Sequence, residues 1–99
     1  MVQHIVMWNF LDTMSAKEKE EAAEKMKALL TPIGALVPGT VDIQVVTKGL
    51  DSSNRDICLI SRFDTKQALK AYQVHPAHVE AGKFVRSVTC NRSCMDYEM

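Results

Sequence analysis

Residues 2–10 are rich in strand-forming side chains and contain no breaker, which predicts a β-strand. Alternation places four side chains on one face, namely His4, Val6, Trp8 and Phe10. The other face is expected to hold Gln3, Ile5, Met7 and Asn9. Because both faces carry large apolar groups, both must be covered. We expect the chain's own helices to cover one face and a partner subunit to cover the other.

A capping box predicts where the first helix begins. Ser15 is followed three residues later by Glu18, the arrangement in which each side chain binds the other's backbone N–H. Apolar residues then recur at spacings of three and four and form one stripe, Ala22, Ala23, Met26, Leu29, Leu30 and Ile33. The prolines and glycines of residues 32–39 predict the end of the helix and a loop.

The middle of the chain predicts a β-hairpin. Residues 41–48 alternate, with Val41, Ile43 and Val45 on one face. A polar turn at residues 49–54 separates them from a third strand over residues 57–63. Two strands joined by a short polar loop pair antiparallel by default.

The last third predicts a broken helix and a final strand. Residues 64–67 form an N-cap with Gln67 at the third helical position, and Ala68, Leu69 and Tyr72 supply the apolar side. Pro76 disfavours a helical His75, so one helix ends there and another begins at the proline. The second helix is expected to reach about residue 86, and its apolar side is Val79, Phe84 and Val85. Residues 89–97 predict the last strand.

The resulting β-α-β-β-α-β order predicts one domain over residues 1–99. It is typical of the ferredoxin-like α+β fold, a four-stranded antiparallel sheet with helices on one face. That layout leaves the second face uncovered, with Ile5 and Met7 on it. We therefore expect a homodimer that forms through the sheet face.

Composition narrows the function classes. Twelve Lys and Arg balance twelve Asp and Glu, so the formal net charge is zero. Such a chain lacks the basic footprint of a nucleic-acid or membrane-surface protein. No apolar run is long enough to span a bilayer, and the N-terminus does not resemble a secretory signal. We expect a cytoplasmic protein with neither nucleic acid nor membrane as partner.

The three cysteines, Cys58, Cys90 and Cys94, are interpreted as buried reduced thiols. Four residues along one strand would separate Cys90 from Cys94 by about 13 Å, too far for a disulfide. No CxxC pair indicates zinc. A combination of His4, His75 and His78 is the alternative metal site that we weigh, and we predict neither a metal nor a cofactor.

The densest group of reactive side chains is Tyr72, His75 and His78, with His4 and Trp8 facing the same interior. Histidine exchanges a proton near neutral pH, and tyrosine can hold a developing oxyanion. Each also has a structural interpretation. His75 suits a turn or N-cap, His78 suits a packing or exposed position, and Tyr72 suits the core with its hydroxyl at the edge.

Arg92 is a further candidate for ligand binding. Alternation groups it with Cys90, Cys94 and Asp96. On the helix-covered face it would need a carboxylate or an anionic ligand, whereas a register slip of one residue would move it to the other face.

Three tracts of the chain resemble a known family. The opening residues 2–8, the tract Tyr72-Gln73-Val74-His75-Pro76-Ala77-His78-Val79 and the closing Asp96-Tyr97 are similar to the stress-responsive α/β barrel domain (Dabb) family. The resemblance extends over essentially the whole chain. It implies protomers that pair sheet to sheet as a dimeric α/β barrel.

The resemblance also implies candidate functions. Some members are stress-induced proteins of unassigned activity, which here predicts a small-molecule binder with a pocket between sheet and helices. A plant polyketide cyclase of the family acts without a cofactor on a carbonyl-rich substrate. Its catalytic positions fall on Tyr72 and His78, and its first-strand histidine falls on His4. The alternative is thus a cyclase-like or isomerase-like enzyme, with His78 as general base and Tyr72 as donor to the carbonyl. A cofactor-free monooxygenase is a second alternative, by fold analogy.

Overall fold

The computed structural model describes residues 1–99 and begins with strand β1, Val2–Phe10. The predicted alternation is confirmed, since His4, Val6, Trp8 and Phe10 are all buried. This inner face of β1 lies against the helices and forms the floor of the core.

Helix α1, Ala16–Leu30, starts at the predicted capping box. The Ser15 hydroxyl accepts from the Glu18 backbone N–H, and the Glu18 carboxylate accepts from the Ser15 backbone N–H. A 3-10 helix, Thr31–Leu36, follows the last α-helical turn and buries Ile33. Inclusion of Leu29 in the buried stripe was wrong, because its side chain is exposed and Leu30 covers that part of the core.

Strands β2, Thr40–Val46, and β3, Ile57–Phe63, form the predicted antiparallel hairpin. Their register shifts between Thr40 and Asp42, where β2 gains an extra residue. The prediction that Val41 shares the buried face with Ile43 and Val45 was therefore wrong, and Val41 is exposed.

Helices α2, Lys66–Val74, and α3, Pro76–Val88, meet at the predicted break. Thr65 is the N-cap of α2, one residue later than predicted, because its hydroxyl accepts from the Ala68 N–H. Helix α3 turns Ala81 and Val85 into the core. The expectation that Val79 belongs to the apolar side was wrong, since it is 48% exposed.

Strand β4, Thr89–Glu98, completes a sheet with the order β2-β3-β1-β4. Its pairing with β1 is irregular near Asn91, which adopts a positive φ of 53°. The irregularity reverses the alternation, so Cys90 pairs with Asn9 on the outer face. Grouping Cys90 with Arg92 was consequently wrong. Cys94 keeps the inner side but is exposed, and Cys58 and Cys90 are only half-buried, so the prediction of three buried thiols was wrong, although all three thiols are free.

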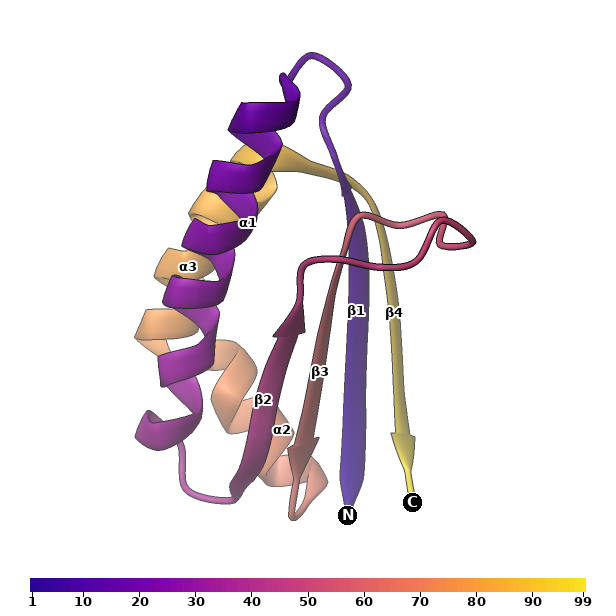
Figure 1. The fold of residues 1–99 in the computed structure, drawn as a ribbon. Coiled ribbons are helices and arrows are strands. Elements are labelled where there is room, and N and C mark those ends of the chain that lie inside the picture. The colour runs from indigo at the N-terminus through magenta and orange to yellow at the C-terminus, as the bar shows by residue number, and fades with distance from the viewer.

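All the helices cover one face of the sheet, as Figure 1 shows, and the ferredoxin-like prediction is confirmed. No helix covers the outer face, and only the loop between β2 and β3 lies over its end near Met7. At its centre Ile5 pairs with Ile60 on one side and Met95 on the other. Met95 is 67% exposed and Met7 is also exposed, so this face presents the unpartnered apolar surface expected from the sequence.

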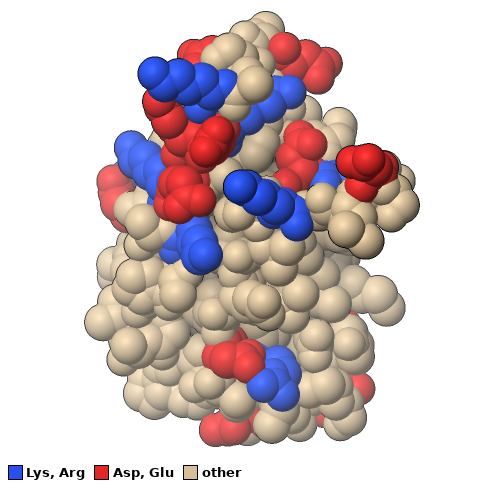
Figure 2. Space-filling model, viewed as in Figure 1, with Lys and Arg blue, Asp and Glu red and all other residues tan.

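Charged side chains of both signs are mixed on the face seen in Figure 2, and they concentrate over α1 and the loop between β2 and β3. No patch of a single sign appears in this view. None of the helices has the length and apolar character needed to cross a bilayer.

Candidate functional site

A cavity of about 280 Å³ lies between the inner face of the sheet and helix α3. Its polar wall is formed by His4, His78, Arg86 and Arg92, with Gln73 beside them. The rest of the lining is mainly apolar and includes Trp8. An apolar pocket with a few convergent polar groups is typical of a small-molecule site.

Tyr72 lies in the core behind this wall, with no exposed surface. Its ring centroid is 4.5 Å from that of His78 and 6.2 Å from that of His4, and Phe63 packs on it at 5.1 Å. The buried hydroxyl has no hydrogen-bond partner in the protein. Burial raises the pKa of Tyr72 to about 12, so the hydroxyl keeps its proton near neutral pH and is available as a hydrogen-bond donor.

His78 comes from the first turn of α3 and lines the cavity directly. Burial lowers its pKa from the ordinary value of 6.5. The backbone of Gln73 acts in the opposite direction, whereas the charges of His4, Arg92 and Arg86 reinforce the lowering. A neutral imidazole beside a protonated phenol is the combination that general base chemistry on a carbonyl compound requires.

His4 is held from the strand next to it. Its Nδ1 contacts the Asp96 carboxylate, because β1 and β4 pair these two residues directly. A carboxylate can only accept, so His4 Nδ1–H is the donor in this contact. Cys94 lies beside this pair, with Sγ 3.6 Å from Asp96 Oδ1 and 4.0 Å from His4 Nδ1.

Arg92 stays on the inner face and lines the cavity, since the strand irregularity lies on its N-terminal side. Arg86 reaches the same cavity from α3 and lies over Gly82, where any added Cβ would come within 3.0 Å of its guanidinium. Neither arginine has a carboxylate partner, so the cavity offers two cationic groups to a ligand.

His75 has a different place from the one expected of a ligand-binding residue. Its Nδ1 accepts from the Ala77 N–H and caps α3, and its side chain is not part of the cavity wall. The structure therefore agrees with the N-cap interpretation and not with the placement of His75 among the ligand-binding residues. The remaining predicted residues meet at one place, with Tyr72 behind the wall and His4, Trp8, His78 and Arg92 in it.

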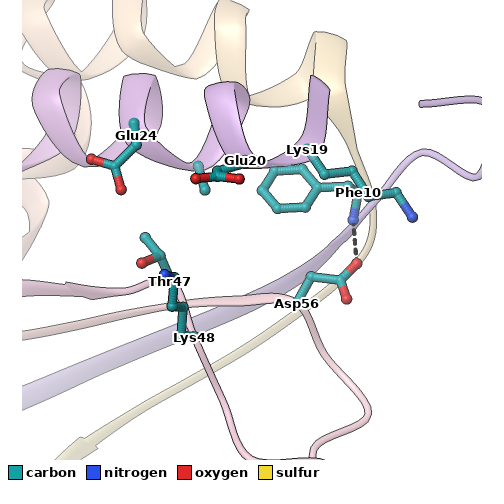
Figure 3. Close-up of a pocket in the computed structure, with 8 residues that line it drawn as sticks. Phe10, Lys19, Glu20, Glu24, Thr47, Lys48 and Asp56 are labelled. Atoms are coloured by element: carbon teal, nitrogen blue, oxygen red, sulfur yellow. Dashed lines mark hydrogen bonds between the residues drawn. The ribbon is translucent and has the colours of Figure 1, made fainter. Parts of the chain in front are cut away.

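A second hollow of about 260 Å³ lies between α1 and the strand ends at Thr47 and Asp56, shown in Figure 3. Glu20 and Glu24 line it from the helix, and Asp56 accepts from the Phe10 N–H. It contains no histidine or tyrosine, so the histidine-lined cavity is the stronger candidate site.

Sequence reasoning did not include Asp96, Arg86 or Gln73 among the site residues. The contact of Asp96 with His4 depends on strand register, and residues 92 positions apart give no local signal of it. Arg86 was read only as the end of a helix. The signal that could have identified Arg86 is Gly82, which lies one helical turn earlier and leaves room for a long side chain.

Comparisons with known proteins agree with the fold described above. Residues 2–99 match the model of the family described as Stress responsive A/B Barrel Domain. No curated protein matches the chain.

Several solved structures have the same fold. A dimeric protein of unknown function from Bacteroides fragilis, described as ferredoxin-like, is 31% identical, with a TM-score of 0.91 over 99% of this chain and 95% of that one. A hydroxynitrile lyase from Passiflora edulis is 15% identical, with a TM-score of 0.77 over 97% and 90%. SnoaB, a cofactor-independent oxygenase from Streptomyces nogalater, is 12% identical, with a TM-score of 0.69 over 99% and 91%. At such identities the last two show the fold alone.

Proposed function

We propose that this protein, which belongs to the stress-responsive A/B barrel domain family, binds a small carbonyl compound in the cavity between its sheet and α3. The ligand's carbonyl oxygen accepts from the Tyr72 hydroxyl, and its other end lies toward Arg86 and Arg92. The cavity's volume of about 280 Å³ suits a compound at the small end of the usual range of ligands.

The observation that carries this proposal is the buried Tyr72 hydroxyl without a partner. An unpaired buried donor costs about 1–3 kcal/mol, and a ligand oxygen would recover that cost. The hydroxyl belongs to a ring that packs edge-on against His78, which lines the cavity. Because Tyr72 is fully buried and does not itself line the cavity, the proposed contact requires the His78 ring to move aside and admit the ligand's oxygen to the phenol.

The two arginines determine which charge the cavity favours in a ligand. Arg86 and Arg92 approach the cavity from different elements, and neither is neutralised by a carboxylate of the chain. They favour a compound that is anionic or that becomes an anionic enolate when it loses a proton from the carbon beside its carbonyl. β-Dicarbonyl compounds meet this description.

Trp8 provides the test, because it is the chain's single tryptophan and lines the cavity. Titration with ethyl acetoacetate, a β-keto ester, should change the fluorescence of Trp8 in a saturable way. Tyr72→Phe should weaken that binding about tenfold, the value of one hydrogen bond. The control is Tyr97→Phe, which alters the only other tyrosine, an exposed one. Unchanged affinity in Tyr72→Phe would refute the proposed contact.

Catalysis on the same ligand is the second candidate function, and the lowered pKa of His78 favours it. The neutral imidazole takes a proton from the carbon between the two carbonyl groups. The electron pair of that C–H bond is then shared by the two carbonyl oxygens of the enolate, one of which accepts from Tyr72 while the other lies toward the arginines. Such a step belongs to cyclases and isomerases that need no cofactor. A cofactor-free oxygenase is supported only by likeness in fold to SnoaB.

A homodimer through the outer face of the sheet is part of the proposal. The Bacteroides fragilis relative is described as dimeric, and the outer face here is apolar and uncovered around Ile5 and Met95. Sedimentation should give twice the chain mass of 11.1 kDa. Met95→Lys should shift the equilibrium toward monomer, whereas Leu50→Lys, in an exposed loop, should not. A wild-type protein that is monomeric at micromolar concentration would contradict this assembly.

The proposed location is the cytoplasm. Cys58, Cys90 and Cys94 are all free thiols in the structure. Unpaired cysteines at three positions suit a reducing compartment.

A further inference from the structure

Three side chains with metal-binding atoms meet beside the cavity. His4 of β1 pairs with Asp96 of β4, and Cys94 lies two residues before Asp96, so all three project from the same face of the sheet. The Cys94 Sγ is 4.0 Å from His4 Nδ1 and 3.6 Å from Asp96 Oδ1, and His4 Nδ1 contacts that same oxygen. One donor atom from each residue lies within 4.8 Å of the other two.

These separations are close to those of a tetrahedral metal site. Zinc binds sulfur at about 2.3 Å and nitrogen or carboxylate oxygen at about 2.0–2.2 Å, which places donor atoms roughly 3.3–3.7 Å apart around the ion. On the same geometry the contact between His4 and Asp96 has to open by about 1 Å, and the Cys94–His4 separation of 4.0 Å has to close by a few tenths of an ångström. The Asp96 and Cys94 side chains can make this adjustment because both residues are exposed, whereas His4 is 2% exposed and fixed in the sheet.

We propose that His4 Nδ1, Cys94 Sγ and Asp96 Oδ1 form a site for a borderline transition-metal ion of the zinc type, with a fourth position open to water. Imidazole and thiolate donors select zinc or cobalt over magnesium and calcium, which need oxygen donors. Binding releases the Cys94 thiol proton to solvent, and His4 binds through Nδ1 as the neutral imidazole with its ring proton on Nε2. Two anionic donors then neutralise a divalent ion, and the exposed side of the cluster gives it a way in.

The site is distinct from the cyclase-like chemistry, which uses Tyr72 and His78. Of the three proposed ligands only His4 also lines the cavity. Its ring forms part of the cavity wall, while its Nδ1 faces Cys94 and Asp96, where the metal is proposed to bind. Sequence spacing did not reveal it. The metal combination weighed from the sequence was His4, His75 and His78, but His75 is used as a helix cap.

Co²⁺ is the probe, because a thiolate ligand gives cobalt a near-ultraviolet charge-transfer band and tetrahedral geometry gives intense visible bands. The metal-free dimer should develop both, with one ion per protomer, and Zn²⁺ should displace the cobalt. Cys94→Ser should abolish the charge-transfer band. Asp96→Ala should weaken binding by more than about 10-fold, which is the lower end of the loss when even an outer-shell partner is removed.

The matched control is Cys90→Ser, on the same strand but paired with Asn9 on the opposite face, and it should bind cobalt like the wild type. Circular dichroism of each variant confirms that it is folded. Absence of the charge-transfer band in the wild type, or its persistence in Cys94→Ser, would overturn the proposal. Tyr72→Phe should retain cobalt binding, so failure of the carbonyl-binding proposal and failure of the metal site give different results.

Discussion

Replacement of Tyr72 by phenylalanine should stabilise the ligand-free protein. When the hydroxyl of a tyrosine is hydrogen-bonded, its replacement by phenylalanine typically lowers the protein's free energy of unfolding by about 1 kcal/mol. Here the hydroxyl is buried without a protein partner, and such a group carries a desolvation cost of about 1–3 kcal/mol. The ring's contacts with Phe63 and His78 are retained in the variant.

The expected gain is about 1 kcal/mol or more in the free energy of unfolding, which for a domain of this size raises Tm by roughly 4–8 °C per kcal/mol. Urea and thermal unfolding should be measured on ligand-free protein at one fixed protomer concentration, because a dimer's stability depends on concentration. Tyr97→Phe is the control and should leave Tm nearly unchanged, since Tyr97 is 40% exposed.

A destabilised Tyr72→Phe variant would refute the reasoning. It would mean that the hydroxyl is already satisfied in the free protein and that Tyr72 is an ordinary core residue. A stabilised variant that also loses ligand binding would instead show a group kept for function at the expense of stability.

Substitutions at three other positions test the fold and the site. Burial lowers the pKa of His78 below 6.5, so the unfolded chain takes up a proton at a higher pH than the folded protein does, and stability should fall as the pH drops from 6.5 through the lower folded pKa. Thermal melts should show that this decline is smaller in His78→Gln. An identical pH dependence in His78→Gln and wild type would contradict the buried neutral imidazole. His75→Ala should lower the free energy of unfolding by about 1 kcal/mol, because it removes the cap of α3. His75→Asn should retain most of that stability and should bind the ligand like the wild type. A loss of ligand affinity in His75→Asn would show that His75 contributes to the binding site. Met26→Ala, at a fully buried position, should cost about 2–5 kcal/mol in urea unfolding. Equal stability of Met26→Ala and wild type would contradict the core.

Local signals predicted the elements well. The Ser15 capping box, the break before Pro76 and the alternation along β1 each act within a few residues, and each appears in the structure at the expected place. The approach of Tyr72 to His78 is also local, because one helix ends and the next begins between them.

The errors arose where strand pairing overrides local pattern. A bulge in β2 exposes Val41, and the irregularity at Asn91 moves Cys90 to the outer face. The same pairing brings Asp96 to His4 from the far end of the chain, so neither the carboxylate partner nor the metal cluster can be seen without the register. Leu29 and Val79 lie at the margins of their apolar stripes, where the tilt of a helix on the sheet decides burial.

The claim that Tyr72 and His78 act together on a carbonyl compound in the cavity is tested most directly by deuterium exchange at the acidic carbon of ethyl acetoacetate. This exchange requires proton removal by His78 while Tyr72 donates to the carbonyl oxygen. Loss of the C2 proton signal is followed by NMR in D2O buffer that contains a chelator, with and without protein. The wild type and Tyr97→Phe should both accelerate exchange, and His78→Gln and Tyr72→Phe should each lose roughly 10²-fold or more of that acceleration. Exchange no faster than in buffer, or equal rates in His78→Gln and wild type, would contradict the account.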